Sequence, residues 1–285
     1  MKKFYIILII FIFLFSGCGS SEKISVSEDV RSILNSYKSS PPEIVIAIDI
    51  EMEKCMSEKN KKYVKGGYKF SLGSADIVNS GSVFYSMDSV SAGYKETVLP
   101  TEERSDSDVT EENYNPADEI KYISLSGVET SISSKSCTAR AAEKVFGSVE
   151  NYLKYSDFAN DILFSARQYK AIDEIVSLYS DNKEYPQCMK DAGYPDVIAF
   201  GLAPKIALQK FGQYRTKDQR PHAEERAMAQ ADYSCQESSN IVRKAEDIFY
   251  DRVGQWLKDH EAYILQIRDI ELFAKDRANK IINQS

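Results

Sequence analysis

Four cysteines in the body of the chain are the residues with the most definite chemistry: Cys55, Cys137, Cys188 and Cys235. They form no C-x-x-C pair and no histidine lies near two of them, so their spacing does not favour a redox or zinc site. Four cysteines in an exported domain are typical of two disulfides, for which three pairings exist. Pairing neighbours in the sequence gives Cys55–Cys137 and Cys188–Cys235, and we predict these two disulfides.

Two of these cysteines occupy similar local sequences. C-M-S-E-K-N begins at Cys55, and C-M-K-D-A-G begins at Cys188. Glycine, and less often asparagine, adopts the left-handed conformation just after a helix end, so we expect both cysteines in the last turns of helices. Cys137 and Cys235 each precede sequence of helical character, so each disulfide is expected to join two helices.

Residues suited to acid–base catalysis are few. The chain has two histidines, His222 and His260, which excludes a three-histidine metal site. Adjacent carboxylates stand at residues 173–174 and 224–225, and on a helix such pairs are usually solvated. His260 lies on an apolar helical face, where it would be a general base or, as we favour, a histidine at the edge of the core. G-x-S-x-G, H-E-x-x-H and phosphate-binding glycine motifs are absent, so we predict no catalytic residue, no metal and no cofactor.

The 18 tyrosines are unusually numerous. They could line a groove for a glycan or a peptide, because tyrosine combines an apolar face with a polar tip. The alternative, which we favour, is that they pack between helices.

The net charge is −7, and no basic block is present, which argues against nucleic acid as a partner. Residues 101–119 contain eight acidic residues and one basic residue. Asp106-x-Asp108 has the start of a calcium loop, but the acid and glycine that should follow are missing. We interpret residues 101–119 as a solvated acidic loop, and a partner-binding surface is the alternative.

Cys18 stands at the end of an apolar N-terminal segment. Two lysines precede the apolar residues 4–15, a run that is short for a membrane span and fits a secretory signal peptide. It ends in L-F-S-G-C, which resembles the bacterial lipobox, with Phe15 where an aliphatic residue is usual. We predict that residues 1–17 are a lipoprotein signal peptide and that Cys18 carries acyl chains such as palmitate. The alternative is an uncleaved anchor with an incidental cysteine.

The remaining sequence must provide the elements that hold these residues. Residues 18–41 are Ser-rich, and we interpret them as a lipidated tether with a short helix near residues 28–37. Apolar residues from Ile44 to Met52 fit a strand period or a helical face, and we predict a helix because the pattern continues to a cap-like Asn60. Residues 61–130 look irregular.

Helical periodicity dominates from Ser136, which is suited to cap a helix ending near Gly147. The clearest pattern extends from Phe249 to Ala274, where apolar residues recur at steps of four and three. The predicted fold is mainly α: a multi-helix bundle over residues 42–285, stapled by two disulfides, with a long C-terminal helix and an irregular acidic loop region.

Several motifs, taken in order, resemble an uncharacterised family of secreted bacterial proteins and lipoproteins. They are the C-M motifs at Cys55 and Cys188, L-S-G-V-E at residues 125–129, C-T-A-R-A at residues 137–141 and A-Q-A-D-Y-S-C at residues 229–235. The resemblance covers residues 43–270, with Asn60 in place of the family's glycine. It implies a disulfide-linked helical fold, and the family has no established activity to carry over.

Together these features predict a lipid-anchored protein of the cell envelope, in the cell membrane or outer membrane, facing the periplasm or the exterior. Its role is expected to be non-catalytic, either structural or in binding an envelope protein or glycan. The alternative is an envelope hydrolase, or a glycan- or peptide-binding protein, that uses a tyrosine-lined cleft.

Overall fold

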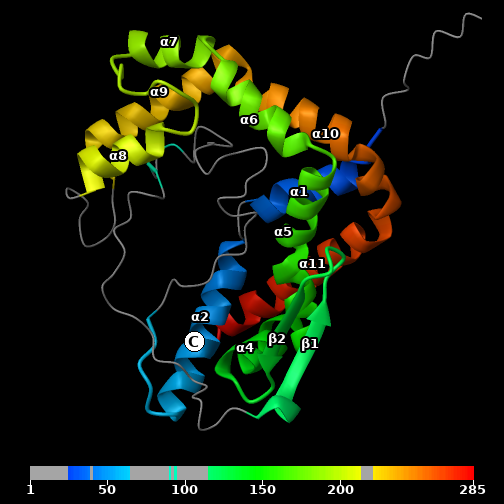
Figure 1. Ribbon diagram of the computed structural model, residues 1–285. Helices are drawn as coiled ribbons and strands as arrows, with labels where there is room; N and C mark the ends of the chain where they lie inside the picture. The colour runs from blue at the N-terminus through cyan, green and yellow to red at the C-terminus, as the bar shows by residue number, and fades with distance from the viewer. Residues whose placement is uncertain (1–24, 39–40, 65–89, 91–92, 95–114, 213–220) are drawn as a thin grey trace, which may run out of the picture.

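The computed structural model describes residues 25–38, 41–64, 90, 93–94, 115–212 and 221–285. Cys18 and residues 101–114 of the acidic segment, including Asp106 and Asp108, therefore lie outside the described residues. Within the described part, the chain forms ten α-helices and one two-stranded antiparallel sheet (Figure 1). In chain order the elements are α1 (Glu28–Lys38), α2 (Pro42–Glu58), β1 (Glu119–Ile123), β2 (Glu129–Ser133), α4 (Cys137–Phe146), α5 (Val149–Gln168), α6 (Ala171–Asp181), α7 (Glu184–Asp191), α8 (Ala203–Phe211), α9 (Ala223–Ser239), α10 (Ile241–Asp259) and α11 (Glu261–Ile282).

The first lobe consists of α1, α2, α4, α5, α6, α10 and α11, which share the larger hydrophobic core. In α2, Ile44, Ile48 and Met52 are buried on one face, which confirms the predicted helix against the strand alternative. Pro42 stands in the first turn of this helix. A backbone N–H at this position would have no intrahelical partner, so the lack of one in proline costs no hydrogen bond. α2 packs against both α4 and α11, which also contact each other (Figure 1).

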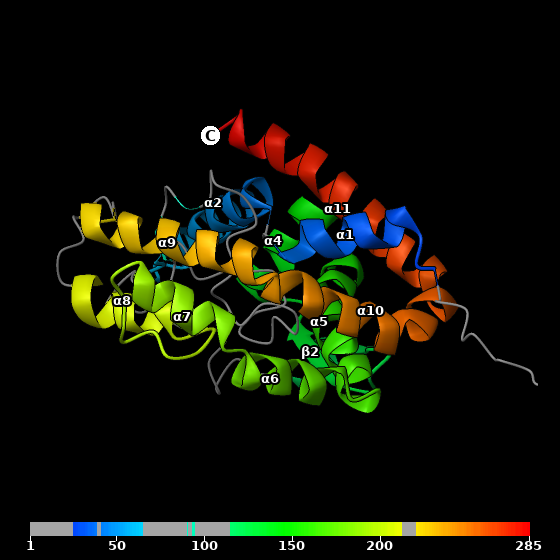
Figure 2. The same ribbon diagram turned by 90° about the horizontal axis from the view of Figure 1, so that it is seen from above.

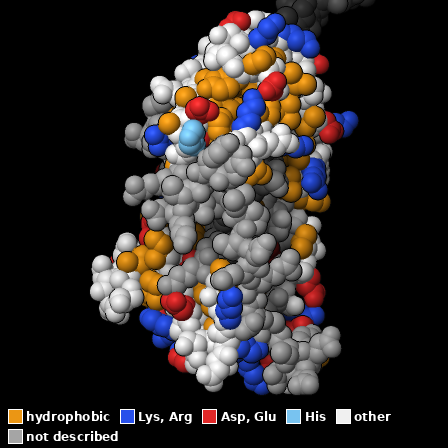
Figure 3. Space-filling view, turned by 90° about the vertical axis from the view of Figure 1, so that its left-hand side faces the viewer, with side chains coloured by type: hydrophobic (Ala, Val, Ile, Leu, Met, Phe, Trp, Pro, Cys, Tyr) orange, Lys and Arg blue, Asp and Glu red, His pale blue; other side chains and the backbone are white. Residues whose placement is uncertain are grey.

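The second lobe consists of α7, α8 and α9 with the start of α10, and it has its own core. Figure 2 shows these three helices together at one side of the molecule, with α9 leading into α10, which enters the first lobe. Hydrophobic side chains gather on the upper part of the face in Figure 3, where this lobe lies. In α8, which begins at Ala203, Pro204 stands in the first turn, where a proline does not interrupt the hydrogen bonds of the helix.

Each lobe contains one of the two predicted disulfides. Cys55 on α2 bonds Cys137 at the start of α4, and Cys188 on α7 bonds Cys235 on α9, with Cα–Cα distances of 5.6 Å in both pairs. The nearest-neighbour pairing is thus confirmed, and so is the expectation that each bond joins two helices.

The shared C-M motif corresponds to the same helix ending in both lobes. Asn60 and Gly193 have positive φ angles of 54° and 94°. The N–H of the following residue donates to the carbonyl of Met56 in one lobe and of Met189 in the other, at 2.8 Å in each case. This six-to-one bond is the Schellman motif, in which a residue in the left-handed conformation ends the helix.

Two predicted boundaries are wrong. The tether was expected to extend to residue 41, but α1 belongs to the first lobe, where Val30, Ile33 and Leu34 are buried and the helix packs on α11. The predicted continuous helix from Phe249 to Ala274 is interrupted at His260, which separates α10 from α11. Both helices bury their apolar faces in the same core, so the periodicity continues through the bend visible in Figure 2.

The segment predicted to be irregular contains a β-hairpin. β1 and β2 pair with Ile120 opposite Ile132 and Tyr122 opposite Thr130. Ile120, Tyr122 and Ile132 pack against a small core formed by α4 and α5. The alternation of apolar and polar residues in β1 is the strand period, and polar residues around it obscured this signal in the sequence.

Candidate functional site

Three tyrosines, Tyr94, Tyr155 and Tyr185, are among the largest fully buried side chains. Each hydroxyl donates a hydrogen bond to a buried carboxylate: Tyr94 and Tyr185 to Asp232, and Tyr155 to Glu271. Because their rings lie in the interior, these tyrosines do not line a groove, and this agrees with the packing interpretation.

Asp232 on α9 is the centre of the buried network in the second lobe. Its side chain is 0% exposed, and its Oδ2 accepts from the Tyr94 hydroxyl at 2.9 Å. Its Oδ1 accepts from the Tyr185 hydroxyl and from the Gln236 amide, both at 2.8 Å. These bonds tie α9 to α7 and to residues 93–94 in the middle of the lobe.

Burial raises the pKa of Asp232 to about 6, even though the three donors lower it. Burial and the neighbouring Asp232 carboxylate also raise the pKa of Tyr94 and Tyr185. Ionisable groups with strongly shifted pKa values are candidates for catalytic residues when they face a cleft, but Asp232 is fully enclosed here. Its three donors are all side chains of the same lobe, so the network positions helices.

The second carboxylate pair differs from its prediction. Glu225 was expected to be solvated, but it is fully buried, and its Oε1 accepts the Tyr94 backbone N–H at 3.0 Å. Its neighbour Glu224 is exposed. In the first pair, Asp173 is exposed and Glu174 forms an ion pair with Arg252 at 2.7 Å, as expected for a helix surface.

A second polar network holds the hairpin to the first lobe. Asp161 on α5 accepts the Ser126 N–H and the Tyr263 hydroxyl, both at 2.8 Å. One turn earlier, Asp157 accepts the hydroxyl of Thr130 at 2.8 Å. Burial raises the pKa of Asp161, although its donors lower it. Both carboxylates are thus engaged by the hairpin, with Tyr263 of α11 supporting it from the other side.

His260 lies at the junction of α10 and α11. Its ring stacks on Trp256 with centroids 4.3 Å apart, and its Nδ1 is 2.8 Å from the Trp256 carbonyl oxygen. Because a carbonyl can only accept, Nδ1 carries the proton in this bond. His222 instead caps α9, where its Nδ1 accepts the Glu224 N–H at 3.4 Å. Both histidines therefore have structural contacts at helix ends.

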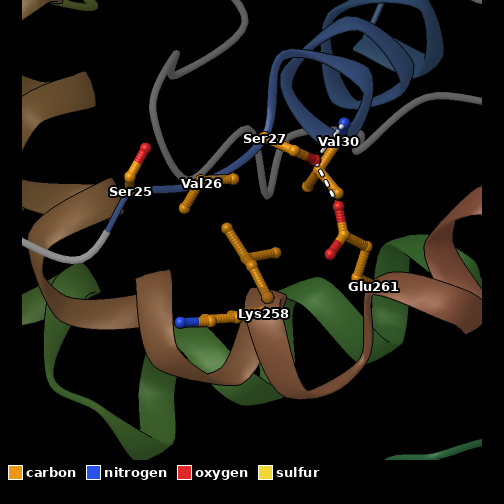
Figure 4. Close-up of a pocket in the computed structure, with 7 residues that line it drawn as sticks. Ser25, Val26, Ser27, Val30, Lys258 and Glu261 are labelled. Atoms are coloured by element: carbon orange, nitrogen blue, oxygen red, sulfur yellow. Dashed lines mark hydrogen bonds between the residues drawn. The ribbon is translucent and has the colours of Figure 1, made fainter.

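A small pocket lies between the start of α1 and the α10–α11 junction (Figure 4). Its volume is about 200 Å³, and Val26, Val30 and Leu257 supply its apolar lining. The Ser27 hydroxyl donates to Glu261 across its edge at 2.5 Å, as the dashed line in Figure 4 shows. This volume is below the range of about 300–1,000 Å³ typical of small-molecule sites.

In the part of the chain that the structure describes, no helix has both the length and the apolar composition needed to cross a bilayer. Among the same residues, no three side chains of His, Cys, Asp or Glu gather as a metal-binding group would require.

Comparisons of the chain with models of protein families, with curated proteins and with solved structures found no match. The residues of the two polar networks are therefore identified from the structure alone. Sequence reasoning missed Asp161, Asp232 and Glu271, although each stands at helical spacing among buried apolar residues. That spacing was the available signal.

Proposed function

We propose that this protein is a lipid-anchored protein of the cell envelope, with a non-catalytic binding or structural role. The observation that carries the proposal is the pair of disulfides, one in each lobe. Disulfides persist in oxidising compartments and are rare where glutathione and thioredoxin keep thiols reduced. The predicted signal peptide at residues 1–17 supplies the route to such a compartment.

The anchor is the acylated thiol of Cys18. Only six residues separate Cys18 from Ser25, where the described structure begins. A single acyl chain binds a bilayer marginally, whereas two or more hold a protein stably. The folded body is accordingly held close to the membrane surface by a short connection.

A non-catalytic role is supported by the way the interior carboxylates are used. Asp161, Asp232 and Glu271 each accept hydrogen bonds from tyrosine hydroxyls of the same chain. The hydrolase alternative needs carboxylates or His260 to converge on an open cleft, and the described contacts of these groups are internal. The tyrosine-lined cleft loses support for the same reason.

The test is metabolic labelling with a radioactive fatty acid, combined with the mass of the mature N-terminus. The Cys18→Ser variant is expected to lose the label and to retain residues 1–17, because cleavage follows acylation. Ser21→Ala, three residues further on, is the matched control and should be labelled like the wild type. Undiminished labelling of the Cys18→Ser variant would contradict the anchor.

A further inference from the structure

The turn of the β1–β2 hairpin presents three aliphatic side chains to the surroundings. Ile123, Leu125 and Val128 are 64%, 48% and 45% exposed. Single exposed apolar residues are common on proteins, but three within six positions form a local apolar surface. We call these three residues the hairpin tip.

The tip is held in a defined conformation. The Ser124 N–H donates to the Val128 carbonyl at 3.0 Å, and the Ser124 and Ser126 hydroxyls bond each other at 2.7 Å. Gly127 has φ 78°, the left-handed conformation that the turn requires. The Ser126 N–H is fixed to Asp161 of α5. The polar groups of the turn thus bond inward, while its aliphatic side chains point outward.

The tip lies at the same end of the molecule as the start of α1. Asp161, which holds the turn, also accepts from Tyr263 near the start of α11. Two residues before Tyr263, Glu261 accepts from Ser27, which directly precedes α1. Figures 1 and 2 agree, because the upper end of the hairpin and the start of α1 both lie on the side of the α10–α11 bend.

The length of chain between Cys18 and α1 limits how far the hairpin tip can lie from the bilayer. The seven Cα–Cα steps from Cys18 to Ser25 span at most about 25 Å when the chain is fully extended. Acyl chains on Cys18 would therefore hold the start of α1 within about 25 Å of the bilayer, which brings the neighbouring hairpin tip within reach of its surface. Such a connection makes a second, weak contact effectively intramolecular.

We propose that the hairpin tip inserts Ile123, Leu125 and Val128 into the surface of the bilayer that holds the acyl chains of Cys18. This inference rests on the proposed anchor. Lys121 and Glu129 at the base of the tip form an ion pair at 2.8 Å, so they add no net charge. Insertion is accordingly apolar and does not depend on anionic lipids.

The consequence is a fixed orientation of the body relative to the membrane. A flexible connection alone would let the protein rotate freely, whereas a second contact defines which face points outward. The second lobe, at the opposite side from the α10–α11 bend in Figure 2, would then project away from the bilayer.

The experiment uses acylated full-length protein bound to vesicles of phosphatidylcholine, with tryptophan as the probe. The chain has one native tryptophan, Trp256, which is buried. The Leu125→Trp variant reports on the tip, and Ile198→Trp is the matched control, because Ile198 is 72% exposed in the second lobe. We expect emission from position 125 to shift to shorter wavelength and to be quenched at least twofold by brominated lipid, with no quenching at position 198.

Equal, unquenched emission from both variants while the protein remains on the vesicles overturns the insertion but leaves the anchor intact. Failure of the acylated protein to bind vesicles is a failure of the anchor, and it is scored separately by flotation. A photocrosslinker at position 125 gives a further readout in intact cells. Coupling to lipid supports the proposal, and coupling to a protein partner overturns it.

Discussion

The buried carboxylate of Asp232 makes the stability of the second lobe dependent on pH. Its pKa is about 6 in the folded protein against 3.8 for an ordinary aspartate. The folded state therefore binds this proton more tightly than the unfolded chain. The associated stability is fully present below the unfolded pKa and is lost as the pH rises through the folded pKa.

The magnitude follows from the size of the shift. One pKa unit corresponds to about 1.4 kcal/mol, so the full shift corresponds to about 3 kcal/mol. About 2 kcal/mol of this is lost between pH 4 and pH 8, because the unfolded carboxyl is already partly ionised at pH 4. The Asp232→Asn variant cannot ionise and has no such loss. Its Oδ1 can keep the bonds from Tyr185 and Gln236, and its amide can donate to the Tyr94 hydroxyl.

The assay is urea unfolding of the wild type and the Asp232→Asn variant at intervals from pH 4 to pH 8, with the disulfides intact. The difference in unfolding free energy between the two proteins should change by about 2 kcal/mol over this range, in favour of the variant at high pH. The contributions of the other titrating groups are the same in both proteins, so they cancel in this difference. Asp173→Asn, at an exposed position on α6, is the control and should change by less than about 0.5 kcal/mol. Parallel pH profiles for wild type and Asp232→Asn would refute the reasoning.

Three further predictions concern stability and are measured by urea unfolding at neutral pH. Replacing both Cys188 and Cys235 with alanine opens a loop of 47 residues and should cost up to about 4 kcal/mol; a loss below about 1 kcal/mol would contradict a structural role for this bond. Tyr155→Phe removes a donor from the buried Glu271 and should cost about 2 kcal/mol, and an unchanged midpoint would show that this bond contributes nothing net. Gly147→Ala forces a side chain into a backbone conformation with φ 79° at the end of α4 and should cost about 1 kcal/mol, so a stabilised variant would mean that the helix end has relaxed.

The sequence predicts the elements whose signals are local. Ser136 caps α4 by accepting the Ala139 N–H at 2.9 Å, and Gly147 ends that helix in the left-handed conformation. The C-M motifs end α2 and α7 in the same way. In each case a few neighbouring residues determine the backbone conformation at the helix end, so no knowledge of distant packing is needed.

The bend at His260 could not be predicted from periodicity. Apolar residues continue at steps of three and four across it because α10 and α11 face the same core. His260 departs from helical geometry at φ −110° and ψ 16°, and neither proline nor glycine stands there to indicate it. Tertiary packing, which folds α11 back over α2 and α4, decides the break.

The buried carboxylates were missed because charged residues were assigned to the surface by type. In α9 the buried face runs through Glu225, Met228, Asp232, Cys235 and Ser239 at steps of three and four. The spacing alone places two carboxylates inside. Their tyrosine partners are far apart in sequence, so only the structure shows how the charges are accommodated.

The central claim is that the protein is exported, acylated and oxidised. The most direct measurement is mass mapping, without reduction, of protein taken from the membranes of its own cells. The account predicts a mature N-terminus at an acylated Cys18, together with linked peptides for Cys55–Cys137 and Cys188–Cys235. A chain that retains residues 1–17 and has five free thiols would contradict it.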